Sequence, residues 1–416
     1  MARLRSLHYA WVILAISFVA VIVPQGLRIA FGAFIPAWEQ EFGVNRATLA
    51  SISSVSFLLY GFGQPLTGRL ADRFGGREVL SGGVLLVGVG AALVALAPTP
   101  VALAAAYIGV ASLGFAAASG VAPVSLIVRW FESNRGLAFG LMGTAIAVGQ
   151  LVVGPAAILG IKAYGWRLTM DAFAAAMIFL LAPLAWLILR SSPERKGLLP
   201  LGAGRAGTRA AARLVMRGPE SVPARSFWFL ALPFFVCGAT TSGLIDTHLV
   251  PLAHDHNVPV DVTAFAVGTL AAFNVGGTLA AGWLADRFPR RTLLGLVYAT
   301  RALSLLLLIN VGSGQLLFLF AVIFGLADFS TVAPTYSLGT EYFGARRGAG
   351  TVVGVLSLGH QVGSAVGAGV TGLLYQLTGS YTLPLALAVA VLVAASLLSF
   401  LLPGEARRQA AAPAAA

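Results

Sequence analysis

The sequence predicts an all-α integral membrane protein, with twelve transmembrane helices in two pseudo-symmetric six-helix bundles. Of its 416 residues, 58% are hydrophobic and only 10% are charged, whereas soluble globular domains carry about 25% charged residues. A membrane-spanning helix needs roughly 20 apolar residues, so this composition supplies about twelve spans. In addition, the chain repeats a motif at about half its length. This composition excludes an ordinary soluble enzyme and a disordered chain.

The expected helices are the apolar stretches between Gly, Pro and charged residues. Six stretches lie in each half of the chain: 9–33, 47–67, 78–97, 101–128, 136–159 and 169–189, then 226–250, 261–281, 292–312, 315–338, 349–375 and 381–402. The segment between the two sets is rich in Arg, Gly and Pro, which is typical of a linker. We therefore expect an N-terminal bundle over 1–190, a cytoplasmic linker over 191–225, a C-terminal bundle over 226–404 and a disordered tail over 405–416.

The distribution of the 27 Lys and Arg residues predicts the orientation in the membrane. Most of them fall at the termini, in the linker and in the turns on that side, while the outer loops keep only Arg46, Lys162 and Arg167. Because cytoplasmic loops are enriched in Lys and Arg, we expect both termini in the cytoplasm and the protein in the inner (plasma) membrane. The net charge of +12 then belongs to a surface that faces anionic lipid. No basic patch with interleaved aromatic residues indicates a nucleic-acid partner.

A ten-residue motif occurs once in each half of the chain. The segment GRLADRFGGR at 68–77 recurs as GWLADRFPRR at 282–291, with seven identical positions at an offset of 214. Acidic side chains can face positive helix N-termini and pair with nearby arginines, so we expect a cytoplasmic latch here, not a substrate contact. The charged residues of this latch are Asp72, Arg73, Arg77, Asp286, Arg287 and Arg291. Two related halves with a site at their interface are a transporter architecture.

The repeated motif resembles the signature loop of the major facilitator superfamily, which joins helices 2 and 3 and recurs between helices 8 and 9. A second motif, over 130–140, resembles the start of helix 5 in monocarboxylate transporters. The pattern over 360–381 resembles bacterial relatives of the lactate and oxalate/formate carriers. The resemblance implies the major facilitator fold and transport of small carboxylates, with a proton or in exchange for another anion. The chain departs from the pattern in helix 8, where the family has an arginine and this sequence has Thr278.

Four charged side chains fall at membrane depth, away from the ends of the expected helices. Each costs ~2.5–3.5 kcal/mol on insertion scales, so each needs a partner or a task. Arg301 and Asp328 come at nearly equal depth when each residue advances a helix by about 1.5 Å, which predicts an ion pair. Two interpretations stay open: the pair braces two helices, or Asp328 exchanges its proton during transport. The other two charged residues are Arg28 and Asp246.

Arg28 is the first candidate for binding an anion. Its planar guanidinium can hold a carboxylate through two parallel hydrogen bonds. It lies in the outer third of the first helix, after Pro24 and Gly26. By the resemblance to monocarboxylate carriers, Arg28 falls at the position where the animal carriers have a lysine. The alternatives are that its side chain extends to the outer surface or pairs with Asp246.

Two histidines within the expected helices are further candidates. His360, next to Gln361 in the eleventh helix, can donate a hydrogen bond to a carboxylate and titrate near neutral pH. A purely structural hydrogen bond is the alternative. His248, near the outer end of the seventh helix, is a candidate for a gate or for proton coupling together with Asp246.

Polar residues that complete the expected cavity are weaker candidates, because each can instead join two helices by a hydrogen bond. They are Asn274, Tyr336 and Gln150. His254 and His256 flank Asp255 in an outer loop, but no further ligands cluster there, so we expect no metal and no other cofactor.

The functional prediction is a secondary transporter of small organic anions, in particular monocarboxylates, that works by alternating access and is coupled to protons. Its partners would be this substrate, protons and the lipid bilayer, and we expect a monomer. The alternative is a proton-driven exporter of hydrophobic or cationic compounds, which the missing helix-8 arginine and the intramembrane acids favour. A membrane-embedded enzyme lacks a nucleophile-elbow, zinc or nucleotide-loop motif, and a receptor would need a sensory domain.

Overall fold

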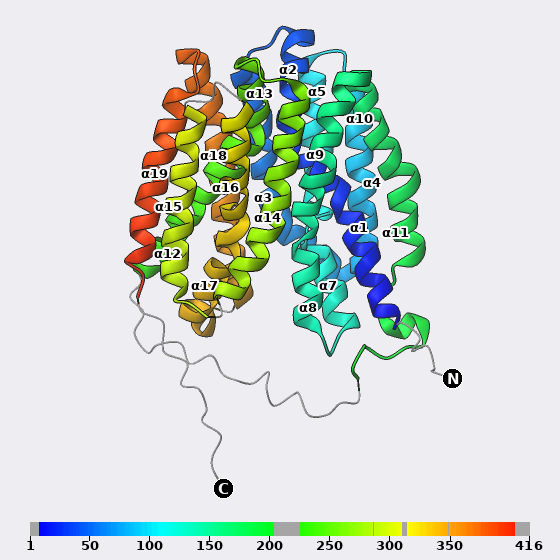
Figure 1. Cartoon of the computed structure of the whole chain (residues 1–416). Coiled ribbons are helices and arrows are strands. Elements are labelled where there is room, and N and C mark those ends of the chain that lie inside the picture. The colour runs from blue at the N-terminus through cyan, green and yellow to red at the C-terminus, as the bar shows by residue number, and fades with distance from the viewer. Residues whose placement is uncertain (1–7, 204–224, 286, 310–313, 348, 404–416) are drawn as a thin grey trace, which may run out of the picture.

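The computed structural model describes residues 8–203, 225–285, 287–309, 314–347 and 349–403. Nearly all of this described part is helical, and most helices run side by side along one axis of the molecule (Figure 1). The predicted tail, the stretch 204–224 of the predicted linker and Asp286 of the predicted latch lie outside the described residues.

Six membrane-spanning units form the N-terminal half, and several of them are interrupted. They are α1 (Tyr9–Ile29) with α2 (Phe31–Phe42); α3 (Arg46–Phe74); α4 (Gly76–Ala95); α5 (Pro100–Ala104) with η1 (Ala105–Ala111), α6 (Ser112–Ala117) and α7 (Val121–Trp130); α8 (Arg135–Gly143) with α9 (Ala145–Tyr164); and α10 (Trp166–Ala175) with η2 (Ala176–Leu181) and α11 (Ala182–Ile188). The short 3₁₀ turn η3 (Pro193–Lys196) follows this half.

Six further units form the C-terminal half. They are α12 (Arg225–Gly238) with η5 (Ala239–Asp246) and α13 (Thr247–Asp255); α14 (Val260–Ala285); α15 (Arg290–Ile309); α16 (Gly314–Ala327) with η6 (Phe329–Thr331) and α17 (Val332–Arg347); α18 (Ala349–Thr378); and α19 (Thr382–Phe400). The segment η5 is π-helical, so its backbone is wound more widely than the α-helices on either side. Such segments occur often at functional sites.

The twelve units agree with the predicted number of spans. In the described part of the chain, eleven of them contain a stretch that is long and apolar enough to cross a membrane. The twelfth unit, α3, has 29 residues, but it is rich in Ser, Thr and Gly and has charged residues at both ends. It packs along α18, so protein covers part of its polar surface.

Several predicted helix boundaries were too short. The first expected helix ends at residue 33, whereas the chain stays helical to Phe42 apart from a break at Ala30. The second is expected over 47–67, whereas α3 continues to Phe74. Charged residues end an apolar stretch without ending a helix, because a helix can project beyond the hydrocarbon core of the membrane.

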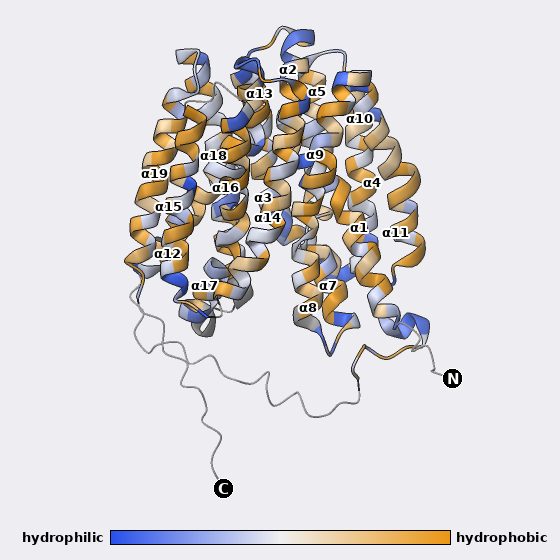
Figure 2. Cartoon of the chain, viewed as in Figure 1, coloured by the Kyte–Doolittle hydropathy of each residue, from blue (hydrophilic) through white to orange (hydrophobic). Residues whose placement is uncertain are grey.

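Each half of the chain has its own hydrophobic core. One cluster of buried apolar side chains extends from Ala10 to Leu189 and adds Ala264 from the other half. A second cluster extends from Leu230 to Leu402. Apolar residues also cover much of the outside of the helices along their length (Figure 2). The two halves are therefore packed as two units in a common apolar shell.

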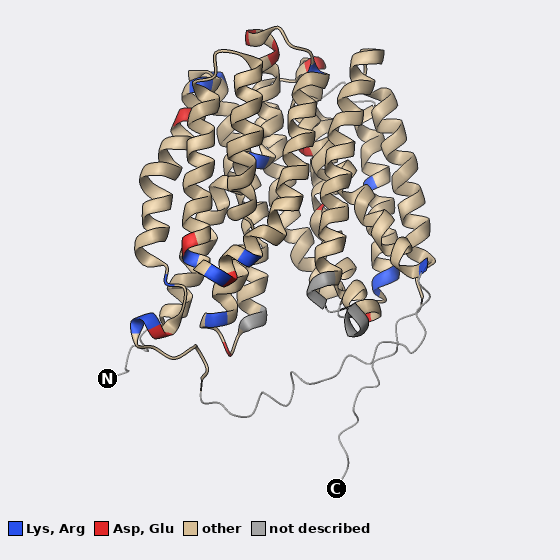
Figure 3. Ribbon diagram, turned by 180° about the vertical axis from the view of Figure 1, so that it is seen from behind, with Lys and Arg blue, Asp and Glu red and all other residues tan. Residues whose placement is uncertain are grey.

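The two ends of the molecule differ in how closely the halves meet. We call the end with the start of α1 and the segment 189–203 the linker face, and the other end, with the α2–α3 turn, the opposite face. Charged residues gather at these two ends (Figure 3). In Figures 1 and 3 the ribbons of the two halves diverge toward the linker face. Hydrogen bonds between the described residues of the two halves extend from the opposite face to the middle of α9 and α14: Arg46–Asp255, Lys162–Asp261, Ser53–Thr247, Ser54–Ala365 and Gln150–Asn274.

Candidate functional site

Arg28 lies near the end of α1, just before the break at Ala30, and is only 7% exposed. Its Nε donates a hydrogen bond to Oε1 of Gln25, at 3.1 Å. The Gln25 amide in turn donates to the carbonyl oxygens of Phe115 and Ala118, at 3.0 and 3.2 Å, where α6 ends. Within the described part of the chain, Nη1 and Nη2 of Arg28 have no hydrogen-bond partner and no carboxylate forms a salt bridge with them. Arg28 therefore presents two unused donors side by side.

Two aromatic rings of α3 fix the plane of this guanidinium. Its central carbon lies 4.8 Å from the centre of the Tyr60 ring and 5.7 Å from that of Phe57. The two rings are three residues apart, so they lie on the same face of α3. A cation over an aromatic ring gains about 0.5–2 kcal/mol. The rings and Gln25 thus hold Arg28 in one orientation without using the donors that a carboxylate would need.

The C-terminal half contributes His360 and Gln361 from α18. The His360 ring lies 4.8 Å from the ring of Phe234, and its side chain is 8% exposed. Nε2 of His360 and Oε1 of Gln361 are buried and have no hydrogen-bond partner among the described residues. A Cβ atom at Gly61 would lie 2.8 Å from the Cβ of Gln361, so α3 and α18 approach closely here. The close approach therefore joins the helix that carries Tyr60 to the helix that carries His360.

Tyr336, a weaker candidate, belongs to the same wall as His360. Its ring lies 5.5 Å from that of Phe234. Its hydroxyl lies 2.7 Å from Oγ of Ser357 on α18. The polar tip of Tyr336 is therefore already hydrogen-bonded, and its ring contributes an apolar surface next to His360.

Arg301 and Asp328 do not form the direct ion pair that the sequence predicted. Instead, Thr241 of η5 lies between them: its hydroxyl accepts a hydrogen bond from Nη2 of Arg301 and donates to Oδ1 of Asp328, at 2.9 Å. Arg301 also donates to Thr240 Oγ1, at 2.7 Å, and to the sulfur of Cys237, at 3.0 Å. The π-helical winding of η5 brings both threonine hydroxyls to one side, where they take the place of the carboxylate. The alternative pair of Arg28 with Asp246 is also absent from the salt bridges of the described residues.

A chain of hydrogen bonds continues from Asp328 into the N-terminal half. Asn274 of α14 donates to Oδ2 of Asp328 at 2.9 Å and to Oε1 of Gln150 at 3.3 Å. Gln150 of α9 donates in turn to Oδ1 of Asp246, at 3.3 Å. The two intramembrane aspartates are therefore linked through two amides. Sequence analysis named both amides only as weak candidates, because helical periodicity does not show which distant side chains meet.

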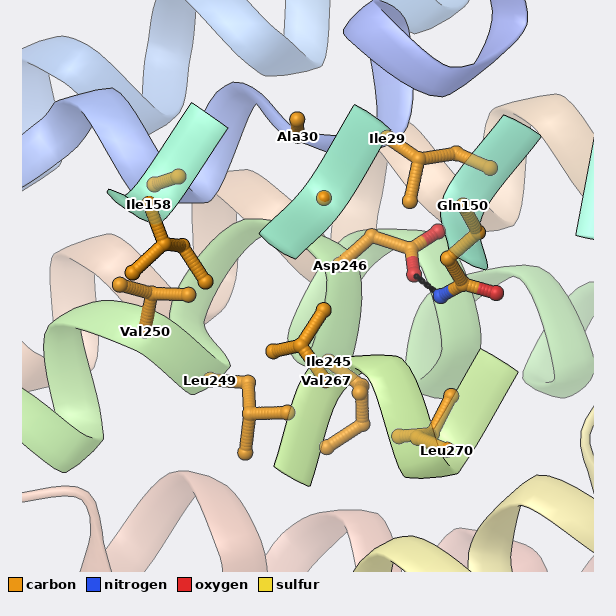
Figure 4. Close-up of a pocket in the computed structure, with 12 residues that line it drawn as sticks. Ile29, Ala30, Gln150, Ile158, Ile245, Asp246, Leu249, Val250, Val267 and Leu270 are labelled. Atoms are coloured by element: carbon orange, nitrogen blue, oxygen red, sulfur yellow. Dashed lines mark hydrogen bonds between the residues drawn. The ribbon is translucent and has the colours of Figure 1, made fainter. Parts of the chain in front are cut away.

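A small cavity adjoins Asp246 at the interface of the halves. Its volume is about 30 Å³, enough for one or two water molecules. Figure 4 shows Asp246 and Gln150 among the residues that line it, with a hydrogen bond to one oxygen of the carboxylate. The other oxygen, Oδ2, is buried and has no hydrogen-bond partner in the described part of the chain. The remaining lining is almost entirely apolar, from α1, α2, α9, η5, α13 and α14.

Arg46, predicted to lie in an outer loop, is the first residue of α3 and joins the two halves at the opposite face. It is 5% exposed and donates to both oxygens of Glu39, at 2.8 and 2.7 Å. It also forms a salt bridge with Asp255 and donates to the hydroxyl of Tyr381, at 3.1 Å. These last two residues lie 209 and 335 positions away in the chain. Only the charge of Arg46 next to a helix start marked it in the sequence.

His248 belongs to the same end of the molecule. Its Nδ1 lies 3.2 Å from the hydroxyl of Tyr381, and its Nε2 lies 3.1 Å from the carbonyl oxygen of Ala368. Both ring nitrogens are therefore engaged between α13, α18 and α19. This position fits the predicted gate better than a contact with substrate.

The predicted latch residues at the linker face bind within their own halves. Arg77 donates to the carbonyl oxygen of Trp186 at 2.8 Å, and Arg291 donates to that of Leu402 at 3.2 Å. Arg73 lies over the ring of Phe74, and Arg287 over that of Trp283. Asp72 is exposed and forms no salt bridge among the described residues. In this structure, the described latch residues do not join the two halves.

The fold and the site together define a class of protein: a multi-pass membrane transporter with a polar site between two six-helix halves. The family model described as Major Facilitator Superfamily matches the sequence over residues 14–250 and 235–416. The chain therefore belongs to the major facilitator superfamily, and it is a transporter and not an enzyme. The predicted family and the predicted twelve-helix fold are confirmed.

Curated relatives match along most of the chain. The MFS-type transporter YcxA of Bacillus subtilis (strain 168) is 27% identical, and the match covers 91% of each chain. Monocarboxylate transporter 13 of Rattus norvegicus is 25% identical over 95% of this chain and 89% of its own. The 4-hydroxybenzoate transporter PcaK of Pseudomonas putida is 26% identical over 70% of this chain and 69% of its own.

A solved structure has the same fold. It is a bacterial homolog of the human lysosomal transporter Spinster, in an inward-facing and occupied conformation. It matches with a TM-score of 0.75 at 19% sequence identity, over 95% of this chain and 97% of that chain.

Proposed function

We propose that this protein transports a small organic anion, in particular a monocarboxylate, together with a proton by alternating access. The observation that carries the proposal is Arg28, a buried cation whose two terminal nitrogens have no hydrogen-bond partner among the described residues, while Gln25, Tyr60 and Phe57 hold it in place. Two parallel donors on a rigid plane match the two oxygens of a carboxylate. His360, with a buried Nε2 that has no partner in the described part of the chain, would bind the other side of the substrate.

The relatives support the same class of substrate. Monocarboxylate transporter 13 and the 4-hydroxybenzoate transporter PcaK are named for compounds that carry one carboxylate. The aromatic rings of Tyr60, Phe57 and Phe234 would cover the apolar part of such an anion.

The arrangement of the halves supports alternating access. They are hydrogen-bonded from the opposite face to mid-depth and diverge at the linker face (Figures 1 and 3). The positive-inside rule predicts that the linker face, with both termini, lies in the cytoplasm, so in this state the halves would be joined on the outer side of the plasma membrane. Transport then requires the contacts of Arg46 at the opposite face to break as the halves rock.

A second candidate function is export of hydrophobic or cationic compounds driven by protons. It is favoured by Thr278 at the position of the family arginine and by the unpartnered oxygen of Asp246, which would attract a cation. The unpaired charge of Arg28 argues against it, because a cation would be repelled from the same site.

Uptake into proteoliposomes tests the proposal. We expect radiolabelled lactate or 4-hydroxybenzoate to accumulate, and Arg28→Gln to weaken apparent affinity on the order of 10- to 100-fold, since hydrogen bonds to charged groups contribute about 1.5–3 kcal/mol. Arg28→Lys should retain part of the uptake. The matched control is Arg129→Gln, an exposed arginine of α7. Unchanged affinity in Arg28→Gln would exclude Arg28 as the anion ligand, and uptake of organic cations alone would favour the exporter.

A further inference from the structure

The two intramembrane aspartates have very different surroundings. Both oxygens of Asp328 accept hydrogen bonds, from Thr241 and Asn274, and Asp328 is 1% exposed. Asp246 accepts a hydrogen bond from Gln150 at Oδ1, and the nearby Ser242 side chain also stabilises the carboxylate, but its buried Oδ2 has no partner of good geometry among the described residues. A buried carboxylate that lacks donors is poorly stabilised as an anion, and protonation removes this cost. Of the two, Asp246 has a position open for a proton.

Asp246 also lies where a movement of the halves would change its surroundings. Its hydrogen bond to Gln150 crosses from η5 to α9, and hence from one half to the other. On the other side, a Cβ at Gly32 would lie 2.6 Å from the backbone oxygen of Asp246, so α2 packs directly against this segment. The cavity beside the carboxylate provides room for the water that would deliver or remove a proton (Figure 4). Asp328, by contrast, binds within its own half through Thr241 and Asn274.

The charged groups around Asp246 set the charge balance of the site. Arg28 on α1, His360 on α18 and Arg301 on α15 act on it electrostatically, and so does Asp328, at the junction of α16 and η6. The helices α9 and α14 present the neutral amides of Gln150 and Asn274, and α2 presents Gly32 and Ala33. The nearby His248 of α13 has both ring nitrogens engaged.

When both aspartates are ionised, their charges cancel those of Arg28 and Arg301. A bound carboxylate would add one negative charge to this buried group, and one proton would restore neutrality. We propose that Asp246, and not Asp328, carries the proton that accompanies the substrate anion, while Asp328 keeps its hydrogen bonds from Thr241 and Asn274. This inference rests on the proposed function. One proton binds Oδ2 from water on one side of the membrane, and the same proton is released to the other side after the halves rock.

The test compares Asp246→Asn with Asp328→Asn in proteoliposomes loaded with a pH-sensitive dye. The substrate is lactate or 4-hydroxybenzoate, whichever the wild type takes up. Asp246→Asn mimics the protonated state. We therefore expect uptake driven by a pH gradient to fall at least tenfold and proton movement to vanish. Exchange of labelled for unlabelled substrate should persist at a reduced rate. Asp328→Asn should keep proton movement wherever it folds. The matched control is Asp171→Asn, an exposed aspartate of α10.

Each outcome decides between the alternatives. Proton-driven uptake that survives in Asp246→Asn but is lost in a folded Asp328→Asn overturns the assignment. Wild-type uptake without any proton movement also overturns it but leaves the proposed carboxylate transport standing. A wild type that moves no carboxylate removes the proposed function itself. If size-exclusion chromatography shows that Asp246→Asn does not fold, Asp246→Ser, which leaves room for water, takes its place with the same expected outcomes.

Discussion

Arg28 and Arg301 are both buried arginines, one in each half, but their environments are opposite. Arg301 is 0% exposed, and its Nη1 and Nη2 donate to Cys237, Thr240 and Thr241. Arg28 is 7% exposed and uses only Nε among the described residues. Among the described residues only Nε of Arg301 lacks a partner. A cation whose two terminal nitrogens bind its own protein holds helices together, whereas one whose terminal nitrogens have no partner there is prepared for a ligand. The same residue type at membrane depth therefore serves stability in one half and recognition in the other.

The largest expected effect comes from removing the satisfied arginine. Arg301→Leu leaves Asp328 buried without its nearby positive charge, and breaking a buried charge pair typically costs about 3–5 kcal/mol. Because Thr241 mediates this contact, the double variant Arg301→Leu with Asp328→Leu should recover most of the loss. The measurement is thermal unfolding of the purified protein in detergent. A single variant that melts like the wild type would show that Arg301 is not a structural cation.

A third buried arginine, Arg46, differs from both, because its hydrogen-bond acceptors come from both halves. Arg46→Gln should shift the protein toward a state that is open at the opposite face. We expect the equilibrium between the two states to change by about 1.5 kcal/mol, or roughly tenfold. This is the lower end for a hydrogen bond to a charged group, because Glu39 and Asp255 are about a fifth exposed. Spin labels on cysteines at Gln40 and Thr378, exposed positions of α2 and α18, would report the change as a population at longer distance.

The control for this experiment is Arg167→Gln. Arg167 lies at the same face, but its salt bridge to Glu41 stays within the N-terminal half. Its removal should leave the distance distribution unchanged. If Arg46→Gln also leaves it unchanged, Arg46 does not hold the opposite face closed.

These comparisons show what the sequence could predict and why the rest was hidden. The repeated motif and the apolar composition were enough for twelve helices in two halves, because both are properties of the chain alone. The unusual cost of charge in a membrane was enough to single out Arg28 and Asp246. Counting residues along a helix gave similar depths for Arg301 and Asp328, but depth says nothing about rotation around the helix axis.

A third helix is the physical reason for the wrong ion pair. Thr241 of the π-helical segment η5 lies between the two charges, whereas the prediction considered only the two helices that carry them. The Arg46 contacts were hidden for another reason: Asp255 and Tyr381 lie 209 and 335 positions away in the chain, and no local pattern marks such a meeting. Likewise, the sequence shows Gln25 only as one polar residue in an apolar helix.

The smallest expected effect concerns this support of Arg28. Gln25→Leu removes the acceptor of the Arg28 Nε hydrogen bond but leaves the charge and both terminal nitrogens in place. A typical hydrogen bond contributes about 0.5–1.5 kcal/mol, so apparent affinity for the transported carboxylate should fall roughly 2- to 10-fold, less than in Arg28→Gln. Gln40→Leu, at an exposed position of α2, is the matched control. Uptake measured over a range of substrate concentrations separates the outcomes. A loss as large as that of Arg28→Gln would mean that Gln25 itself touches the substrate, and Arg28 would then be one of two ligands in this half and not a lone cation held by its neighbours.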